Sequence, residues 1–245
     1  MIATDRPTGW IDDHATWMNL ATEEYRRLDE QLRSLTESEW RAATPCPGWD
    51  VHAMVAHLCG AAAGNASVRE SARQARLSRG YDLPTFVDRV NEVQIAERSD
   101  RTPQDLVAEL AEKGVAGVRS RTRLPRPVRA LVVPFGPPLG TKSVGYLMDR
   151  IYTRDAWMHR IDIADATGRE LHLTPDHDGL LVADVVAEWA RIHGRPFRLR
   201  LTGPAGLETS RGTGGEELEL DAIEFARLAA GRGSAEGLLS TPVPF

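Results

Sequence analysis

An acidic residue and a histidine stand four residues apart within a long segment, Val144 to Thr167, that is predicted to be helical. At this spacing the side chains of Asp155 and His159 lie one turn apart on the same face of the helix. A carboxylate and an imidazole in this arrangement form a two-point clamp for a divalent metal ion. A third ligand must come from another helix, so the pair favours a helical bundle in which distant segments meet.

His57 is the leading candidate for the third ligand. It lies in an apolar stretch of a helix that Asp50 is expected to cap. Three protein ligands and an open position are typical of catalytic zinc sites, whereas structural sites are closed by four ligands. Two imidazoles and a carboxylate suit zinc, and nickel, iron or manganese are also compatible. Tyr152 and Asp162 lie on the same helix face as Asp155 and His159. They are expected to hydrogen-bond to the metal ligands from outside and so to fix a histidine tautomer or a bound water.

The other histidines are poorer candidates. His52 precedes His57 by five residues and therefore points about 140° away around the helix. His14, on the first predicted helix, could reach the site. The remaining three are expected on the surface: His172, His177 and His193. A simpler alternative for the helical pair is an exposed contact that contributes a few tenths of a kcal/mol, and for His57 it is a core histidine with a satisfied hydrogen bond.

Bulk composition excludes several classes of protein. The chain has 245 residues, 42% of them hydrophobic, which is enough for one large domain or two smaller ones. With a net charge of −5 it lacks the basic face that nucleic acids need, and the arginine-rich residues 119–129 are interpreted as a solvated connection. No apolar run reaches the roughly 20 residues that span a bilayer, and residues 1–7 have no secretory core. Cys46 and Cys59 are interpreted as reduced thiols. We therefore expect a soluble cytoplasmic protein without nucleic-acid or membrane partners.

Hydrophobic periodicity changes along the chain, from helical in the first two-thirds to partly alternating in the last third. Predicted helices occupy residues 12–35, 50 to beyond 58, 84–98, 102–123, 144–167, 176–193 and 221–230. Predicted strands occupy residues 198–202, 207–210 and 217–221, and the proline-rich residues 124–140 are predicted to be a long crossover loop. The pattern indicates an α+β chain with a helical bundle at residues 1–170 and a small α+β domain at residues 171–245.

Other catalytic motifs are absent from the sequence. There is no Gly-x-Gly-x-x-Gly after a predicted strand, no phosphate-binding loop and no Gly-x-Ser-x-Gly elbow. A nucleophile at Cys46 beside Trp49 is conceivable, but the sequence places no base near it. Gly60 and Gly64 are expected to let another helix approach their own helix closely.

Two motifs resemble those of a known family. They are Thr44-Pro-Cys-Pro-Gly-Trp-Asp-Val, leading into Val55-Ala-His-Leu, and Arg154-Asp-Ala-Trp-Met-His-Arg-Ile-Asp162. They resemble the mycothiol-dependent maleylpyruvate isomerase family, which belongs to the DinB-like four-helix metalloproteins. The resemblance implies a DinB-like bundle that binds metal through His57, Asp155 and His159, followed by a small C-terminal α/β domain of the sterol-carrier-protein type. In such proteins the position of Asp155 is a glutamate, one methylene longer.

The resemblance also implies a cofactor and a reaction class. The cofactor is mycothiol, a low-molecular-weight thiol, and Arg232 is the best match for an arginine that functions in catalysis and cofactor binding. The expected metal is a divalent ion, zinc, which lowers the pKa of a coordinated thiol. The thiolate then adds to an electrophilic small molecule, and reversal after bond rotation gives cis–trans isomerisation, whereas no reversal gives a thiol conjugate. Arg160 or Arg232 could hold a substrate carboxylate, although Arg160 also fits a surface ion pair.

Two alternatives keep other functions open. A metal-bound water could act in hydrolysis without any thiol, or the chain could be a non-enzymatic module that binds metal or a small ligand. Besides substrate and thiol no partner is expected, and the protein is expected to be a monomer or a homodimer.

Overall fold

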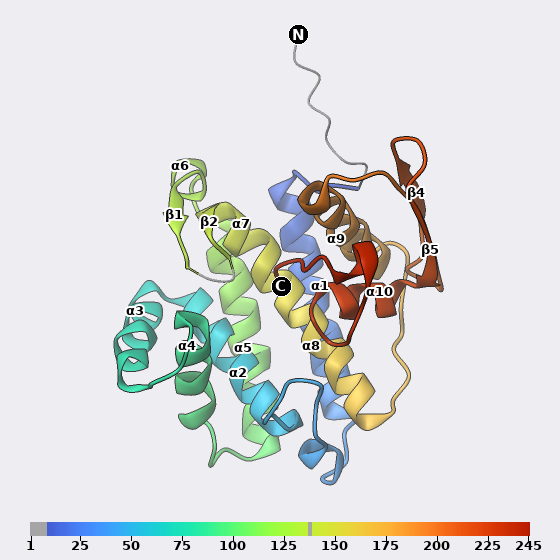
Figure 1. Cartoon of the computed structure of the whole chain (residues 1–245). Helices are drawn as coiled ribbons and strands as arrows, with labels where there is room; N and C mark the ends of the chain where they lie inside the picture. Colours follow the sequence, from blue (N-terminus) through green and yellow to red (C-terminus); the bar gives the residue numbers. More distant parts are fainter. Residues whose placement is uncertain (1–8, 137–138) are drawn as a thin grey trace. The chain divides into compact units, whose positions relative to one another are not determined.

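The residues that the computed structural model describes are 9–136 and 139–245. The expectation about residues 1–7 and the part of the predicted loop at residues 137–138 lie outside them. The chain divides into two compact units, one of residues 14–170 and one that joins residues 171–245 to the segment ending at Asp13 (Figure 1). The helices that were predicted for the first two-thirds of the chain form the unit of residues 14–170, which is called the first unit below.

Two of the four main helices of the first unit begin where the sequence supplies a cap. The bundle helices are α1 (His14–Arg33), α2 (Val51–Ala66), α5 (Pro103–Thr122) and α8 (Tyr152–Thr167). The Asp50 side chain accepts a hydrogen bond from the Ala53 amide at the start of α2. Thr102 and Asp105 form a reciprocal capping box at the start of α5, and Pro103 occupies its first turn. Capping therefore fixes the start of α2, which carries His57, and the start of α5, which packs against α2.

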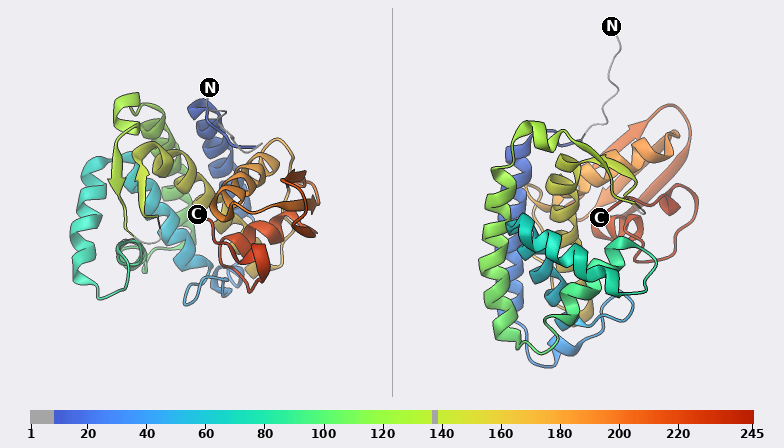
Figure 2. Two further views of the ribbon diagram at one scale, coloured as in Figure 1. Left: turned by 45° about the horizontal axis from the view of Figure 1, so that its top comes forward. Right: turned by 90° about the vertical axis from the view of Figure 1, so that its left-hand side faces the viewer.

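Contacts along the lengths of these four helices establish their relative directions. Helices α1 and α8 run in one direction and α2 and α5 in the other, as Figures 1 and 2 also show. The contacts that establish this are His14–Asp149, Glu24–Arg160, Cys59–Leu106, Gly117–Asn65, His14–Thr122 and Tyr25–Gly114. Buried side chains of all four helices fill the centre of the bundle, among them Leu28, Met54, Leu58, Leu106 and Ile163.

Gly60 permits a close approach that shapes the site. A Cβ atom added at Gly60 would lie 2.4 Å from Cγ of Gln94, which belongs to helix α4 (Phe86–Ala96). This confirms the expectation for Gly60, because any larger residue would push α4 away. At Gly64 an added Cβ would meet only ordinary contacts of 3.5 Å with the side chains of Ser71 and Gln74.

Several elements were not predicted. Helix α3 (Val68–Leu77) forms because Ser67 is extended, ends α2 and caps α3 through the Glu70 amide. The predicted loop at residues 124–140 instead contains the short helix α6 (Arg126–Arg129) and strand β1 (Val132–Pro134), which pairs antiparallel with β2 (Thr141–Ser143). Short 3₁₀ turns are η1 (Glu39–Arg41), η2 (Ser78–Gly80) and η4 (Gly237–Ser240).

The predicted helix at residues 144–167 is not uniform. It begins as α7 (Val144–Tyr146), widens into a π-helical segment (Leu147–Ile151) and continues as α8. In the wide segment the buried Asp149 accepts a hydrogen bond from Nδ1 of His14 at 3.0 Å and pairs with Arg129. This polar anchorage overrides the regular helical period, which the hydrophobic pattern alone cannot reveal.

The second unit is built around one three-stranded sheet. Its elements are α9 (Asp178–His193), β3 (Phe197–Thr202), β4 (Glu208–Arg211), β5 (Glu216–Asp221) and α10 (Ala222–Ala229). The strand order is β4-β3-β5, with β3 antiparallel to β4 and parallel to β5. Phe197, Leu199 and Leu201 are buried while Arg198 and Arg200 are exposed, as the alternation in the sequence predicts. Among the described residues, no helix combines the length and apolarity that crossing a membrane requires.

Candidate metal centre

Helices α2 and α8 bring together three side chains that are remote in sequence. Nε2 of His57 lies 3.4 Å from Oδ2 of Asp155, and Nε2 of His159 lies 3.4 Å from Oδ1 of the same carboxylate. One potential ligand atom from each of the three residues lies within 4.8 Å of the other two. The i,i+4 pair and the distant histidine therefore form one cluster, as the sequence predicts for a metal site.

A chain of amide side chains fixes the orientation of His57. Nε2 of Gln74 donates to the Gly60 carbonyl at 3.0 Å, and Nε2 of Gln94 donates to Oε1 of Gln74 at 2.9 Å. Oε1 of Gln94 is thereby turned toward Nδ1 of His57, at 2.8 Å. Since an amide oxygen can only accept, Nδ1 of His57 donates to Gln94, and Nε2 of the same ring faces Asp155.

His159 is oriented in the same way by a carboxylate. Its Nδ1 lies 3.0 Å from Oδ2 of Asp162, which is completely buried one turn further along α8. The expectation that Asp162 is an outer partner of the cluster is confirmed. Tyr152 is half-buried on the same helix, and burial and then the Asp155 carboxylate raise its pKa, but no hydrogen bond from it to the three residues is present in the described structure.

Burial and mutual attraction oppose each other at the three residues. Burial by itself would raise the pKa of Asp155, but the imidazoles of His159 and His57 outweigh it and hold the pKa well below its usual range. For His159, burial disfavours the charged form, yet Asp155, Asp162 and Cys46 together raise its pKa well above the usual value. In the metal-free protein this arrangement holds a carboxylate and a protonated imidazole in contact.

The loop before α2 covers the cluster. The Trp49 ring lies 5.2 Å from the His57 ring and 5.9 Å from the His159 ring, measured between centroids. Both histidine side chains are only 6% exposed, whereas the Asp155 side chain is 24% exposed. The cluster is therefore closed on the side of the imidazoles and reaches solvent at the carboxylate.

The residues present fit a divalent cation. Zinc binds histidine nitrogen and carboxylate oxygen at about 2.0–2.2 Å, which puts ligand atoms of a tetrahedral site about 3.4 Å apart. Each imidazole Nε2 lies at this distance from one carboxylate oxygen of Asp155, that of His57 from Oδ2 and that of His159 from Oδ1. Both imidazoles present Nε2 and have Nδ1 hydrogen-bonded, which is the arrangement of histidines that ligate metals. Three ligands leave a position for a further group, as in catalytic sites.

The other predicted residues lie elsewhere or differ from expectation. His52 points away, with Nε2 2.8 Å from the Arg101 carbonyl, and His14 pairs with Asp149 instead of joining the cluster. His172 is exposed and His193 is half-buried, but the surface prediction for His177 is wrong, since only 3% of it is exposed. Arg160 is neither on the surface nor available to a substrate, because it is buried and its Nε donates to the buried Glu24 at 2.6 Å.

Arg232 belongs to the second unit. It is half-buried, and its Nη1 donates to the Ala230 carbonyl at 3.0 Å. Its role in catalysis and cofactor binding stays a prediction.

Sequence reasoning missed the residues that orient the imidazoles from outside α8. Gln74 and Gln94 lie on helices α3 and α4, and neither position belongs to a recognisable motif. The one available signal is Gly60, whose missing side chain makes room for Gln94. The sequence indicates Cys46 as a reduced thiol and a conceivable nucleophile, and gives no sign that this thiol lies 3.8 Å from Oδ2 of Asp162.

The fold and the cluster define a class: a helical bundle with a buried two-histidine, one-carboxylate centre, joined to a small α/β unit. Residues 21–164 match the family model described as the mycothiol maleylpyruvate isomerase N-terminal domain, and the chain belongs to this family.

Two solved structures are similar over 90% of both chains, with a TM-score of 0.60 and 17% sequence identity. They are the mycothiol-dependent maleylpyruvate isomerase and a histidine-to-alanine mutant of it. At this identity the likeness concerns the fold, and it confirms the predicted α+β class. No functionally curated protein matches the chain.

Proposed function

We propose that this protein is a metal-dependent enzyme that uses a low-molecular-weight thiol, mycothiol, in the isomerisation or thiol conjugation of an electrophilic small molecule. The observation that carries the proposal is the cluster of His57, Asp155 and His159 with its two Nε2 atoms turned inward. Family membership supports the thiol and the isomerase-like chemistry. Zinc is the proposed metal, because two imidazoles and a carboxylate suit it well.

His57, Asp155 and His159 would hold the cation. When bound, a divalent cation supplies the positive charge that lowers the pKa of a coordinated thiol toward neutral pH. The aspartate in place of the family's glutamate is compatible with this role, because its two oxygens already reach a separation of 3.4 Å from the two imidazoles.

The surrounding residues have supporting roles. Gln94 and Asp162 keep the imidazoles in the metal-binding tautomer and prevent their rotation. Trp49 shields the two rings from water on one side, which strengthens electrostatic interactions within the site. The exposed side of Asp155 is where we place access for thiol and substrate. Arg232 remains the proposed contact for the cofactor.

The decisive experiment combines metal analysis with thiol dependence. Purified wild-type protein and the variants His57→Ala, Asp155→Ala and His159→Ala are analysed for bound metal, with His52→Ala as the control on the same helix. We expect wild type and the control to retain metal and each of the three variants to lose more than about tenfold in affinity. Maleylpyruvate isomerisation is then assayed with and without mycothiol, and other electrophiles are tested for thiol conjugates.

The outcomes separate the proposal from its rivals. Turnover that needs both metal and thiol supports it. Metal-dependent hydrolysis of a test electrophile without thiol would identify a hydrolase. A protein that binds no metal under any of these conditions, and that catalyses neither reaction, would be a ligand-binding module instead.

A further inference from the structure

A rigid loop holds the Cys46 thiol beside the proposed metal centre. The Thr44 amide donates to the Trp49 carbonyl at 3.0 Å, the Trp49 amide donates to the Cys46 carbonyl at 3.1 Å, and Thr44 Oγ1 donates to the Trp49 carbonyl at 2.9 Å. Gly48 occupies a left-handed conformation with φ of 81°, which closes the turn. The position of the thiol is thus set by the backbone of the loop.

The thiol faces a pair of side chains that already interact. Sγ of Cys46 lies 3.8 Å from Oδ2 of Asp162, the same oxygen that lies 3.0 Å from Nδ1 of His159. Single ligand atoms of these three residues also lie within 4.8 Å of one another, so they form a second cluster of metal-ligating types. Two interpretations are therefore available. The three residues could bind a second metal ion, with His159 contributing Nδ1, or they could form a chain of hydrogen bonds from Cys46 through Asp162 to the His159 imidazole.

The geometry decides between them. A separation of 3.0 Å between His159 Nδ1 and Asp162 Oδ2 is a hydrogen-bond length, and ligand atoms of a tetrahedral metal site lie further apart, at about 3.4 Å. A metal on Nδ1 would also displace the hydrogen bond to Asp162 and leave the ring proton on Nε2, which faces the first cluster. His57 has its Nδ1 held by Gln94 in the same manner, so both imidazoles are prepared to bind through Nε2.

We propose that Cys46 is a positioning residue of the metal centre: its thiol donates to Asp162, and Asp162 in turn holds the Nδ1 proton of His159. This inference rests on the metal site of the proposed function. With both donors in place, Oδ2 of Asp162 accepts from two directions, which restricts its movement. Without the thiol, this carboxylate oxygen is freer to move, and the imidazole that depends on it is held less firmly.

This chain of hydrogen bonds predicts opposite outcomes for two substitutions of Cys46. Cys46→Ser keeps a hydroxyl donor but loses apolar character, whereas Cys46→Val keeps apolar volume but loses the donor. A cysteine that only packs against the bundle core would tolerate valine better than serine. A cysteine that acts through Asp162 tolerates serine better, so the order of the two variants tests the inference.

The experiment uses the full chain loaded with Co²⁺, whose visible absorption reports ligand geometry. We expect wild type and Cys46→Ser to share one d–d spectrum, and Cys46→Val to show an altered spectrum with about three- to tenfold weaker Co²⁺ affinity. Asp162→Asn is the positive control, with an expected loss of about ten- to a hundredfold. Cys59→Ala is the matched negative control, because Cys59 donates to the Leu106 carbonyl in the core and lies outside both clusters.

Two results would overturn the inference. A thiolate-to-cobalt charge-transfer band in wild type, absent in Cys46→Ser, would make Cys46 a direct ligand. Unchanged spectrum and affinity in Cys46→Val, with circular dichroism showing a folded protein, would make it a packing residue. Failure of the proposed metal site is recognised separately, because wild type would then bind no Co²⁺ and His57→Ala would change nothing.

Discussion

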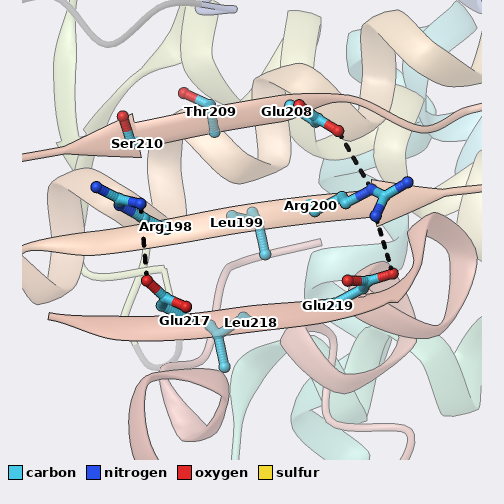
Figure 3. Close-up of a pocket in the computed structure, with 9 residues that line it drawn as sticks. All are labelled: Arg198, Leu199, Arg200, Glu208, Thr209, Ser210, Glu217, Leu218 and Glu219. Carbon is cyan, nitrogen blue, oxygen red and sulfur yellow. Dashed lines mark hydrogen bonds and ion pairs between the residues drawn. The ribbon is translucent and has the colours of Figure 1, made fainter.

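Both units of this protein contain acidic side chains in contact with basic ones, yet the consequences differ. In the first unit, Asp155 contacts two imidazoles at 3.4 Å, and both imidazole side chains are 6% exposed. In the second unit, Arg200 pairs with Glu208 at 3.2 Å and with Glu219 at 3.4 Å, but these three side chains are 59% to 74% exposed. Figure 3 shows how the latter side chains lie across the outer face of the sheet.

The difference lies in burial and in anchorage. A depression of about 710 Å³ spreads over the outer face of the sheet and is lined by its charged side chains, so water reaches every pair. Screening by water leaves such pairs little net energy. In the bundle, each imidazole is held by a second side chain, and exclusion of water strengthens the field of every charge. The buried cluster of His57, Asp155 and His159 is thus a better candidate for a functional site than the depression on the sheet.

The largest effect is expected when one carboxylate is removed from each region. Asp155→Ala should weaken zinc affinity by on the order of a hundredfold or more, because it removes a ligand and places two imidazoles together without their counter-charge. Glu217→Ala, which breaks the exposed 3.7 Å pair with Arg198, should leave zinc affinity unchanged. Chelator competition measures both. A zinc affinity that falls equally in the two variants would remove the distinction between the regions.

A pH series should show a proton leaving the bundle when metal binds. The pKa of His159 is raised, so the imidazole is protonated in the metal-free protein at neutral pH, and the cation must displace that proton. Zinc affinity should therefore rise with pH, by up to about tenfold per unit, and level off above the pKa of His159. The pKa of Asp155 is lowered, so this carboxylate stays ionised and adds no second proton.

Calorimetry in buffers of different ionisation enthalpy counts the released protons. About one proton is expected below the plateau. Affinity that falls with rising pH in this range would contradict the assignment. Glu217→Ala again provides the comparison, since loss of an exposed pair should not alter the number of protons released.

Much of this cluster was predictable from sequence, because its candidate ligands lie in segments that follow short-range rules. The four-residue spacing of Asp155 and His159 fixes their common face, and the capping residues Asp50 and Thr102 mark the helices around His57. The alternation at residues 197–202 likewise gives the buried and exposed faces of β3. Such features depend on neighbours along the chain, which a single sequence displays.

What could not be predicted depends on partners that are distant in sequence. The Gln74–Gln94–His57 chain joins three helices, and no periodicity marks a glutamine as an anchor. The burial of Arg160 depends on Glu24, which is 136 residues away. Parallel pairing of β5 with β3 follows from the tertiary arrangement and not from the strand pattern itself.

A smaller effect is expected from replacing Asp155 with a longer acid. Asp155→Glu adds one methylene to a carboxylate that already has one oxygen 3.4 Å from each imidazole. The longer side chain must fold back or displace α8, so we expect zinc affinity to fall by about three- to tenfold, well short of the loss in Asp155→Ala. Chelator competition ranks the two variants. Equal losses would mean that ligand reach, and not carboxylate chemistry, limits this site.

The smallest effect is expected on the outer face of the sheet. Arg200→Gln breaks two ion pairs at once, but all three side chains are well exposed, and the free energy of unfolding should change by no more than about 0.5 kcal/mol. Its zinc affinity should equal that of wild type. Urea denaturation at low and high salt measures the change, and added salt should erase it, because exposed pairs are screened within about 10 Å at 0.1 M ionic strength. A salt-independent loss of several kcal/mol would show that this exposed network stabilises the unit as a buried one does, and burial would no longer explain the contrast between the two regions.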